Sequence, residues 1–304
     1  MDVLVTGITG YLGSVLTPAL LRDGHAVRGF ARHPERVTAD VPVVAGNAVT
    51  GAGLEAALAG IDVAYYLIHS MEPSADGPFA SRDRTAAERF AAAAVDAGVR
   101  RIVYLGGLVP EGEAASDHLA SRLGVEEILL GALPDSVAFR ASIVIGARSR
   151  SFRFLVRLVE RLAVVPLPGW QTNRTQPIDE RDIVALLAAA ATSEAAAGQS
   201  LDAGGRDVVT YRELVERIRD LMLIDRPTIG LKRLTVTPIA SRIAAVIAGE
   251  DHELIGPLME SLGSDLLLRD DRAPELLGVR MHSLDAAIEH SLAEWERTET
   301  LAAR

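Results

Sequence analysis

The chain has 304 residues, 49% of them hydrophobic and only 4% aromatic, and its 41 acidic and 31 basic side chains give a net charge of −10. This acidic balance argues against DNA or RNA as the main partner. The absence of cysteine excludes disulfides, thiolate nucleophiles and cysteine metal sites, and it fits a reducing cytoplasm. No apolar run approaches the roughly 18 residues of a membrane span, and no signal-peptide pattern is seen. We therefore expect a cytoplasmic protein without a membrane partner.

The first predicted elements are a strand at 2–6 and a helix at 11–23. The segment that joins them carries three glycines spaced three residues apart and ends in Gly-Tyr-Leu-Gly. A strand that runs through spaced glycines into a helix is typical of a dinucleotide site, because the backbone can approach a pyrophosphate and the helix N-terminus offers free N–H groups. We expect the cofactor phosphates to be held by Thr6, Gly7, Thr9, Gly10, Tyr11, Leu12 and Gly13.

Strand-like and helix-like patterns alternate through the first two-thirds of the chain. Strands are predicted at 2–6, 26–31, 42–45, 62–67, 101–106 and 136–141, with a last sheet strand at 201–204. Helices are predicted near 11–23, 51–59, 80–97, 117–131, 150–162 and 180–191. This alternation indicates βαβ units, and so an α/β fold with a doubly wound parallel sheet covered by helices on both faces.

The rhythm changes after about residue 145, and from Thr210 onward the chain is mostly helical. We predict a nucleotide-binding domain over 1–204, with part of a substrate loop at 150–178, and a smaller, mainly helical C-terminal lobe over 205–304. In open sheets of this kind, ligands bind at the carboxyl ends of the strands. We therefore expect the crevice to lie between the glycine segment and the C-terminal lobe.

The end of the second predicted strand indicates which cofactor is bound. No acidic residue occurs between Val27 and Pro34, whereas Arg28 and Arg32 both do. An acidic side chain at this point would bind the ribose hydroxyls of NAD, and an arginine can pair with the 2′-phosphate of NADP. We therefore expect NADP(H) to be preferred over NAD(H), with Arg32 at the 2′-phosphate. The alternative is that these arginines are solvated surface charges.

Taken together, several segments resemble the extended and atypical short-chain dehydrogenases/reductases, which include NmrA-like and epimerase-like proteins. The resemblance rests on the glycine segment, on 65–69 after the fourth strand, on 140–146 after the sixth and on 176–183. It implies a Rossmann fold that binds NAD(P), with Asn47, Ile68 and His69 among the cofactor contacts and Asn47 at the adenine. Asn47 could instead cap a turn, and a turn role suits His69 equally well.

The usual catalytic residues of that family are missing. Its members carry Ser or Thr at the end of the fifth strand and Tyr-x-x-x-Lys on the next helix. This chain has 105–108 as Leu-Gly-Gly-Leu, and His118 and Arg122 stand at the i, i+4 spacing of the tyrosine and lysine. Three hypotheses stay open. His118 is a substitute acid/base with Arg122 on the cofactor; water or the substrate supplies the proton; or the cofactor is bound without turnover.

Two classes of function follow from these observations. One is an NADPH-dependent reductase of a small carbonyl or quinone-like substrate. The other is a non-catalytic NADP(H) sensor that binds a protein partner. No Gly-x-Ser-x-Gly motif is present, which disfavours a hydrolase, and no histidine spacing predicts a metal site. The sequence leaves the substrate and the oligomeric state open.

Overall fold

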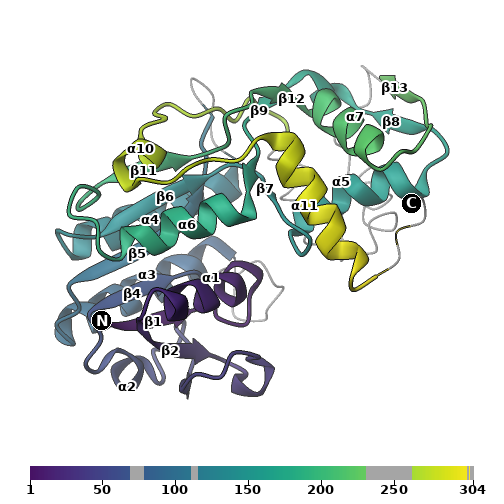
Figure 1. Cartoon of the computed structure of the whole chain (residues 1–304). Helices are drawn as coiled ribbons and strands as arrows, with labels where there is room; N and C mark the ends of the chain where they lie inside the picture. Colours follow the sequence, from purple (N-terminus) through teal and green to yellow (C-terminus); the bar gives the residue numbers. More distant parts are fainter. Residues whose placement is uncertain (69–78, 111–115, 231–261, 300, 302–304) are drawn as a thin grey trace.

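The computed structural model describes residues 1–68, 79–110, 116–230, 262–299 and 301. Its larger lobe is centred on a seven-stranded sheet (Figure 1). In spatial order the strands are β11 (Ser200–Ala203), β6 (Val137–Ala141), β5 (Arg101–Gly107), β4 (Val63–Tyr66), β1 (Asp2–Thr6), β2 (Ala26–Ala31) and β3 (Val43–Ala45). All neighbouring pairs are parallel. The order reverses between β1 and β4, so the predicted doubly wound sheet is confirmed.

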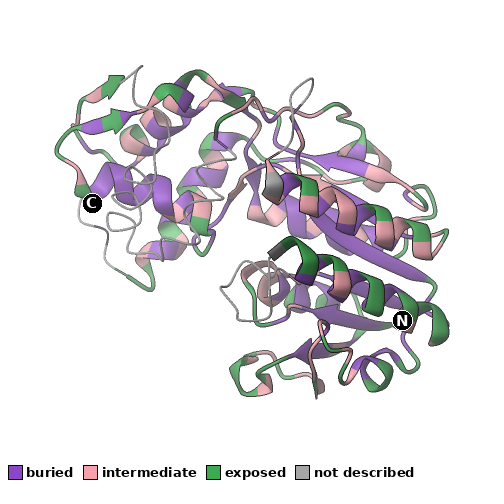
Figure 2. Ribbon diagram, turned by 180° about the vertical axis from the view of Figure 1, so that it is seen from behind, coloured by how far each residue is buried: buried purple, intermediate pink, exposed green. Residues whose placement is uncertain are grey.

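The two faces of the sheet pack against different helices, because successive strand residues point to opposite sides. Val3, Val5 and Tyr65 share one core with α1 (Tyr11–Arg22) and α6 (Glu180–Ala190). Leu4 and Tyr66 share the other with α2 (Leu54–Leu58), α3 (Phe79–Asp96) and α4 (Asp117–Ala132). Figure 2 shows these strands buried between helices whose outer faces are exposed. Buried on both faces, the strands are mostly apolar, as their sequences predicted.

The helix predicted at 51–59 is shorter than expected and spans only Leu54–Leu58. Gly51 and Gly53 both have positive φ angles, of 81° and 79°. A right-handed helix cannot include such residues, so α2 begins only after the second of them. The other predicted helices match α1, α3, α4, α6 and α5 (Arg150–Arg161) to within one or two residues.

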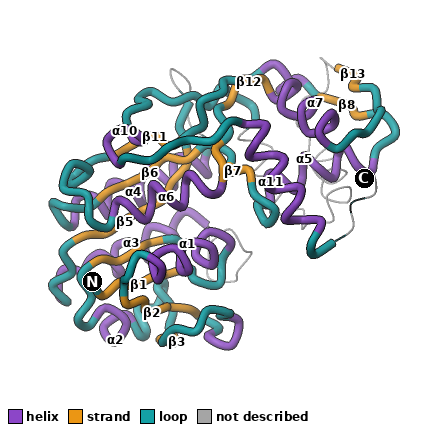
Figure 3. The backbone as a smooth tube through the Cα atoms, in the orientation of Figure 1, coloured by secondary structure: helices purple, strands orange, loops and turns teal. Residues whose placement is uncertain are grey.

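The smaller lobe is built around α5, α7 (Tyr211–Leu221) and α11 (Leu284–Glu296), with short strand pairs at its edges (Figure 3). These pairs are β7 (Val144–Ile145) with β10 (Ile178–Asp179), β9 (Arg174–Thr175) with β12 (Val209–Thr210), and β8 (Val165–Leu167) with β13 (Thr228–Gly230). Its described core draws on residues within 145–170 on one side of the predicted boundary after residue 204, and on residues within 209–224 and 262–295 and on Leu301 on the other. The short helix α10 (Ala273–Leu277) instead packs on α6 and β11 of the larger lobe. Within the described ranges, no helix has both the length and the apolar character needed to cross a bilayer.

Candidate active site

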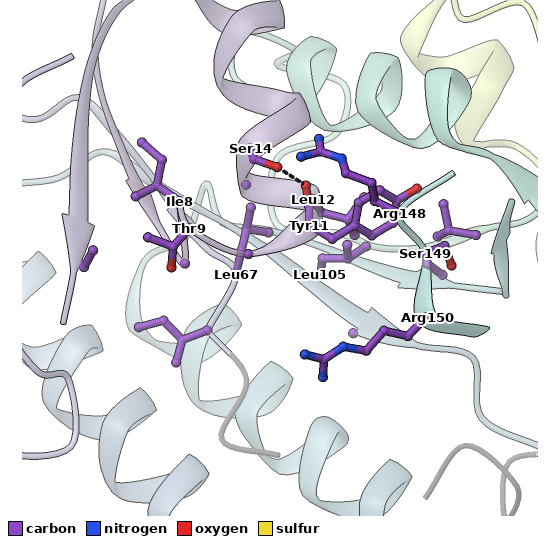
Figure 4. A pocket seen from close by; sticks show the side chains of 18 of the residues that line it. Ile8, Thr9, Tyr11, Leu12, Ser14, Leu67, Leu105, Arg148, Ser149 and Arg150 are labelled. Atoms are coloured by element: carbon purple, nitrogen blue, oxygen red, sulfur yellow. Dashed lines mark hydrogen bonds between the residues drawn. The ribbon is translucent and has the colours of Figure 1, made fainter. Parts of the chain in front are cut away.

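A cavity of about 850 Å³ lies at the carboxyl edge of the sheet, where the strand order reverses (Figure 4). Its walls come from the glycine segment, from the ends of β2, β4, β5 and β6, from α4, and from 148–151 at the start of α5. Ligand pockets in proteins commonly measure about 300–1,000 Å³. The position is the one at which doubly wound sheets bind dinucleotides.

The glycine segment forms a tight backbone cradle on one wall of the cavity. Gly7 has a φ of +66°, and a Cβ atom there would lie 2.6 Å from the carbonyl oxygen of Leu67. The Gly10 N–H donates to the Gly7 carbonyl over 2.8 Å. A Cβ on Gly13 would overlap the Gly7 backbone and lie 2.8 Å from the Cα of Ile8. Gly7 and Gly13 therefore have no room for a side chain, and Tyr11, Leu12 and Gly13, which begin α1, place its N-terminus at the cavity wall.

Two residues of the predicted phosphate loop have contacts that the sequence did not indicate. Thr6 is fully buried and does not line the cavity; its hydroxyl donates to the Tyr65 carbonyl over 2.9 Å and accepts from the Leu67 N–H over 3.1 Å. These two hydrogen bonds therefore tie the start of the glycine loop to the end of β4. Tyr11 does line the cavity, and burial followed by the neighbouring carboxylate of Glu180 raises the pKa of its phenol far above the ordinary value. The remaining predicted loop residues, Thr9, Gly10, Leu12 and Gly13, line the cavity directly.

Arg28 of β2 and Arg32, which directly follows that strand, have different surroundings. The guanidinium of Arg28 donates to the carbonyls of Ala57 and Ala59, over 2.9 and 2.8 Å, and so caps the end of α2. Arg32 lines the cavity instead, together with Arg36 of the 3-10 turn η1 (Pro34–Arg36). Arg36 was not predicted, although it lies only four residues beyond Arg32.

The other predicted cofactor contacts have mixed outcomes. Asn47 lines the cavity, and its Oδ1 atom also accepts from the Val49 N–H over 2.9 Å, so the turn role is present as well. Ile68 lines the cavity just beyond β4. His69 lies outside the described residues.

The charged side chains that line the cavity, within the described part of the chain, are arginines. Six arginines line it, and no aspartate or glutamate does so among the described residues; the six are Arg32, Arg36, Arg82, Arg122, Arg148 and Arg150. This contrasts with the net charge of −10 of the whole chain. A polyanion such as a dinucleotide fits a wall of this kind. Arg82, Arg148 and Arg150 were not predicted from the sequence, although the last two closely follow the segment 140–146 at the same sheet edge.

His118 and Arg122 both line the cavity from one face of α4, as their spacing implied. Arg122 is buried, donates to the Leu105 carbonyl over 2.6 Å, and lies over the Tyr104 ring at 5.5 Å. Burial, followed by the charge of Arg122, lowers the pKa of His118 to about 4. His118 is therefore neutral at pH 7, which removes the imidazolium that a histidine acid would need.

A second, apolar pocket of about 150 Å³ adjoins the main cavity. The two share Gly107, His118, Ala141, Ser142, Ile143 and Ser151. Beyond these, the side pocket is lined by Leu108, Leu119, Phe154, Leu155, Tyr211, Leu262 and Leu266. Ser142 was not singled out from the sequence, yet it stands at the junction of the two spaces. Its hydroxyl lies 3.1 Å from that of Thr175.

Comparison with known proteins agrees with this geometry. Residues 7–126 match the model of an NAD(P)H-binding protein family. Over 219 residues the chain is 30% identical to a (4-alkanoyl-5-oxo-2,5-dihydrofuran-3-yl)methyl phosphate reductase of Streptomyces griseus, a match that covers 69% of this chain and 70% of the relative. It is 26% identical over 229 residues to NADH dehydrogenase (ubiquinone) 1 alpha subcomplex subunit 9, mitochondrial, of Arabidopsis thaliana. That match covers 72% of this chain but only 57% of the relative.

The fold has a solved counterpart of nearly the same extent. A short-chain dehydrogenase/reductase superfamily protein of Agrobacterium tumefaciens, crystallised with bound NAD, superposes with a TM-score of 0.70 at 18% identity. The superposition covers 98% of this chain and 97% of that one. The glycine cradle and the doubly wound sheet thus point to the same family as these relatives do. The chain belongs to the NAD(P)H-binding short-chain dehydrogenases/reductases, as an atypical member of that oxidoreductase family.

Proposed function

We propose that the protein is an NADPH-dependent reductase of a small carbonyl compound that carries an apolar group. The observation that carries this proposal is the apolar side pocket, which opens from the cofactor cavity at a junction with polar side chains. A reductase needs such a junction, because the reacting carbonyl must meet the cofactor while the rest of the substrate is held elsewhere. A non-catalytic sensor needs no second pocket.

The cavity residues fit NADPH from one end to the other. The N–H groups at Tyr11–Gly13 would hold the pyrophosphate, and Arg32 with Arg36 would hold the 2′-phosphate. Asn47 would lie at the adenine. When bound, the reduced nicotinamide supplies a hydride. The preference for NADPH rests on the two arginines and on the absence of a lining carboxylate among the described residues.

The polar side chains at the far end of the cavity favour a substrate that carries an oxygen atom. His118, Ser142 and Ser151 are the polar side chains that both spaces share. We assign His118 a hydrogen bond to the substrate oxygen in its neutral form, with Arg122 stabilising negative charge nearby. Arg148 and Arg150 are two further exposed cations that line the main cavity. The Streptomyces relative acts on a compound named for an alkanoyl group and a phosphate, and an apolar pocket beside arginines would suit such a combination.

The test is NADPH consumption with compounds of graded length. We would assay acetaldehyde, hexanal, decanal, 2-decanone and menadione, each with NADPH and with NADH. If the chain enters the side pocket, kcat/KM should rise by up to about fourfold for each buried methylene until the pocket is full, since a buried CH₂ is worth about 0.8 kcal/mol. A rate that is independent of chain length would reject the pocket as the substrate site. NADPH binding without turnover of any compound would favour the sensor.

A further inference from the structure

We propose that Ser142, Thr175 and Tyr211 form a hydroxyl relay that delivers a proton to the carbonyl oxygen of the substrate. The inference rests on the proposed reductase function. It assigns the acid step, which the family normally gives to a tyrosine that this chain lacks, to residues of β9, of α7 and of the loop after β6.

The three hydroxyls are linked and buried. Ser142 follows β6 directly and lines both the cofactor cavity and the side pocket. Its Oγ lies 3.1 Å from Thr175 Oγ1. Tyr211 directly follows β12, the partner strand of β9, and a hydrogen bond with the Thr175 side chain offsets part of the rise that burial causes in the pKa of its phenol. Exposed fractions are 7% for Ser142, 1% for Thr175 and 2% for Tyr211. A continuous chain of hydroxyls therefore begins at the junction where the carbonyl would lie.

The backbone around the relay is fixed by separate contacts. The Ser142 N–H donates to the Ala203 carbonyl over 2.9 Å, which holds the end of β6 beside β11. Thr175 pairs with Val209 across the antiparallel strands β9 and β12. The ring of Tyr211 meets that of Trp170 edge to face, with centroids 5.8 Å apart. Each hydroxyl thus keeps its place without depending on the next one.

Proton movement along this chain balances the reduction. As the carbonyl carbon accepts a hydride, its C=O π pair moves onto oxygen, which takes the proton of Ser142 Oγ. Ser142 takes the proton of Thr175, and Thr175 takes that of Tyr211. Tyr211 lines the side pocket; once the product has left that pocket, a solvent water protonates the phenolate, and the hydroxide that remains is released to the bulk. The sum is one hydride and one proton added to the carbonyl, and no other co-reactant is needed.

The acidities suit this direction of transfer. Burial raises the pKa of Tyr211 to about 12, so the phenol is protonated at neutral pH. It is still a stronger acid than bulk water, whose pKa is about 15.7. His118 is neutral at pH 7 and has no imidazolium proton to give. Ser142 is a side chain of the junction that has a proton source behind it, in the hydroxyls of Thr175 and Tyr211.

Substitutions that remove one hydroxyl at a time test the relay with decanal and menadione. Ser142→Ala and Tyr211→Phe should each lower kcat by about 100-fold, the lower range of a lost general acid, while the NADPH dissociation constant measured by fluorescence stays unchanged. The matched control is Tyr65→Phe, which also removes a buried phenol hydroxyl. The Tyr65 hydroxyl donates to the Leu187 carbonyl, and Tyr65 lines neither the cavity nor the side pocket. Its kcat should equal that of the wild type.

Two further measurements separate a relay from a purely structural hydrogen bond. The proton inventory of kcat in mixtures of H₂O and D₂O should be curved for the wild type, because several protons move together, and linear for Tyr211→Phe. Thr175→Ser should keep most of the turnover, and Thr175→Val should lose it. Without any substrate, Thr175→Val should also shift the Tyr211 titration followed by ¹³C NMR of the phenol carbon.

The outcomes distinguish the relay from the function it rests on. Normal turnover by Ser142→Ala and Tyr211→Phe, with an active wild type, overturns the relay and leaves the reductase standing. An unchanged Tyr211 titration in Thr175→Val overturns the hydrogen-bonded chain itself. A wild type that reduces none of the panel compounds while binding NADPH overturns the proposed function, and the catalytic role of the relay with it.

Discussion

The two ends of the cavity are built in different ways. The glycine end comes from one continuous run, 7–13, and the groups that we propose as its phosphate ligands are backbone N–H groups. The far end gathers His118, Ser142 and Ser151 from three separate segments and depends on their side chains. A site made of backbone N–H groups can form in any sequence that has the glycines, because every non-proline residue supplies the same N–H group. A side-chain site can change its chemistry without disturbing the sheet, which is how a member of the family can lose the usual tyrosine and lysine.

The largest expected effect is at the glycine end. Gly13→Ala would place a methyl group against the Gly7 backbone and 2.8 Å from the Cα of Ile8. The loop and α1 must then move apart, which displaces the N–H groups from the phosphates. We expect NADPH affinity to fall by at least about 100-fold, equivalent to about 3 kcal/mol, as measured by calorimetry.

The matched control for that substitution is another helical glycine. Gly131 lies in α4 and has open space where a Cβ would go. Gly131→Ala should leave NADPH affinity unchanged and should stabilise the fold by up to about 1 kcal/mol, because alanine favours a helix over glycine. If both variants bound NADPH as the wild type does, the cradle would not be the phosphate site.

The second prediction concerns His118, at the far end of the cavity, and the pH dependence of stability. His118 stays neutral in the fold down to about pH 4, whereas in the unfolded chain it gains a proton below about pH 6.5. Between these values the unfolded state binds more protons, so the free energy of unfolding should fall as the pH drops. The loss should reach up to about 3 kcal/mol at pH 4. Urea titrations of the wild type and of His118→Gln, compared over this range, would measure it.

The control for this pH effect is His33, whose side chain is 54% exposed beside Glu35. His33→Gln should retain the pH dependence of the wild type, and His118→Gln should lose the His118 share of it. The same neutrality implies that His118 contributes no step to the pH profile of turnover between pH 6 and 8. A step there that disappears in His118→Gln would restore the imidazolium as the acid.

The smallest predicted effect is a difference between the binding of NADPH and the binding of NADH. Arg32→Ala should weaken NADPH binding by about 1–3 kcal/mol and leave NADH binding nearly unchanged, because only NADPH carries a 2′-phosphate. Arg28→Ala is the matched control, since its guanidinium binds the carbonyls at the end of α2. That variant should lower stability without distinguishing NADPH from NADH. Equal losses for both nucleotides in Arg32→Ala would remove Arg32 from this role.

The sequence was informative where structure depends on neighbours along the chain. The sheet strands were predicted to within one or two residues, because buried parallel strands are apolar runs bounded by turns. The glycine segment predicted its own cradle for the same reason. Thr6 shows the limit of such reasoning. Its place in the motif suggested a phosphate contact, but its hydroxyl is used by Tyr65 and Leu67, partners about 60 residues away.

The far end could not be assembled from local patterns. The Ser142–Thr175 contact joins residues 33 positions apart, and Tyr211 reaches Thr175 only because β12 pairs with β9. Neither periodicity nor motif spacing encodes such a meeting. The sequence did place His118 and Arg122 on one helix face. It could not show that burial and the neighbouring cation would keep the imidazole neutral.

The arginine lining of the cavity has a consequence for how quickly ligands arrive. At long range an anionic nucleotide meets a molecule of net charge −10 and is repelled. Once it is within about one Debye length of the six arginines, some 8–10 Å at ordinary ionic strength, attraction takes over. Added salt should therefore weaken both influences at once, speeding the approach of NADPH while shortening its residence. We therefore expect NADPH to associate more slowly than it would with an arginine-lined site on a neutral protein. The lifetime of the complex would then depend on short-range contacts with the cavity.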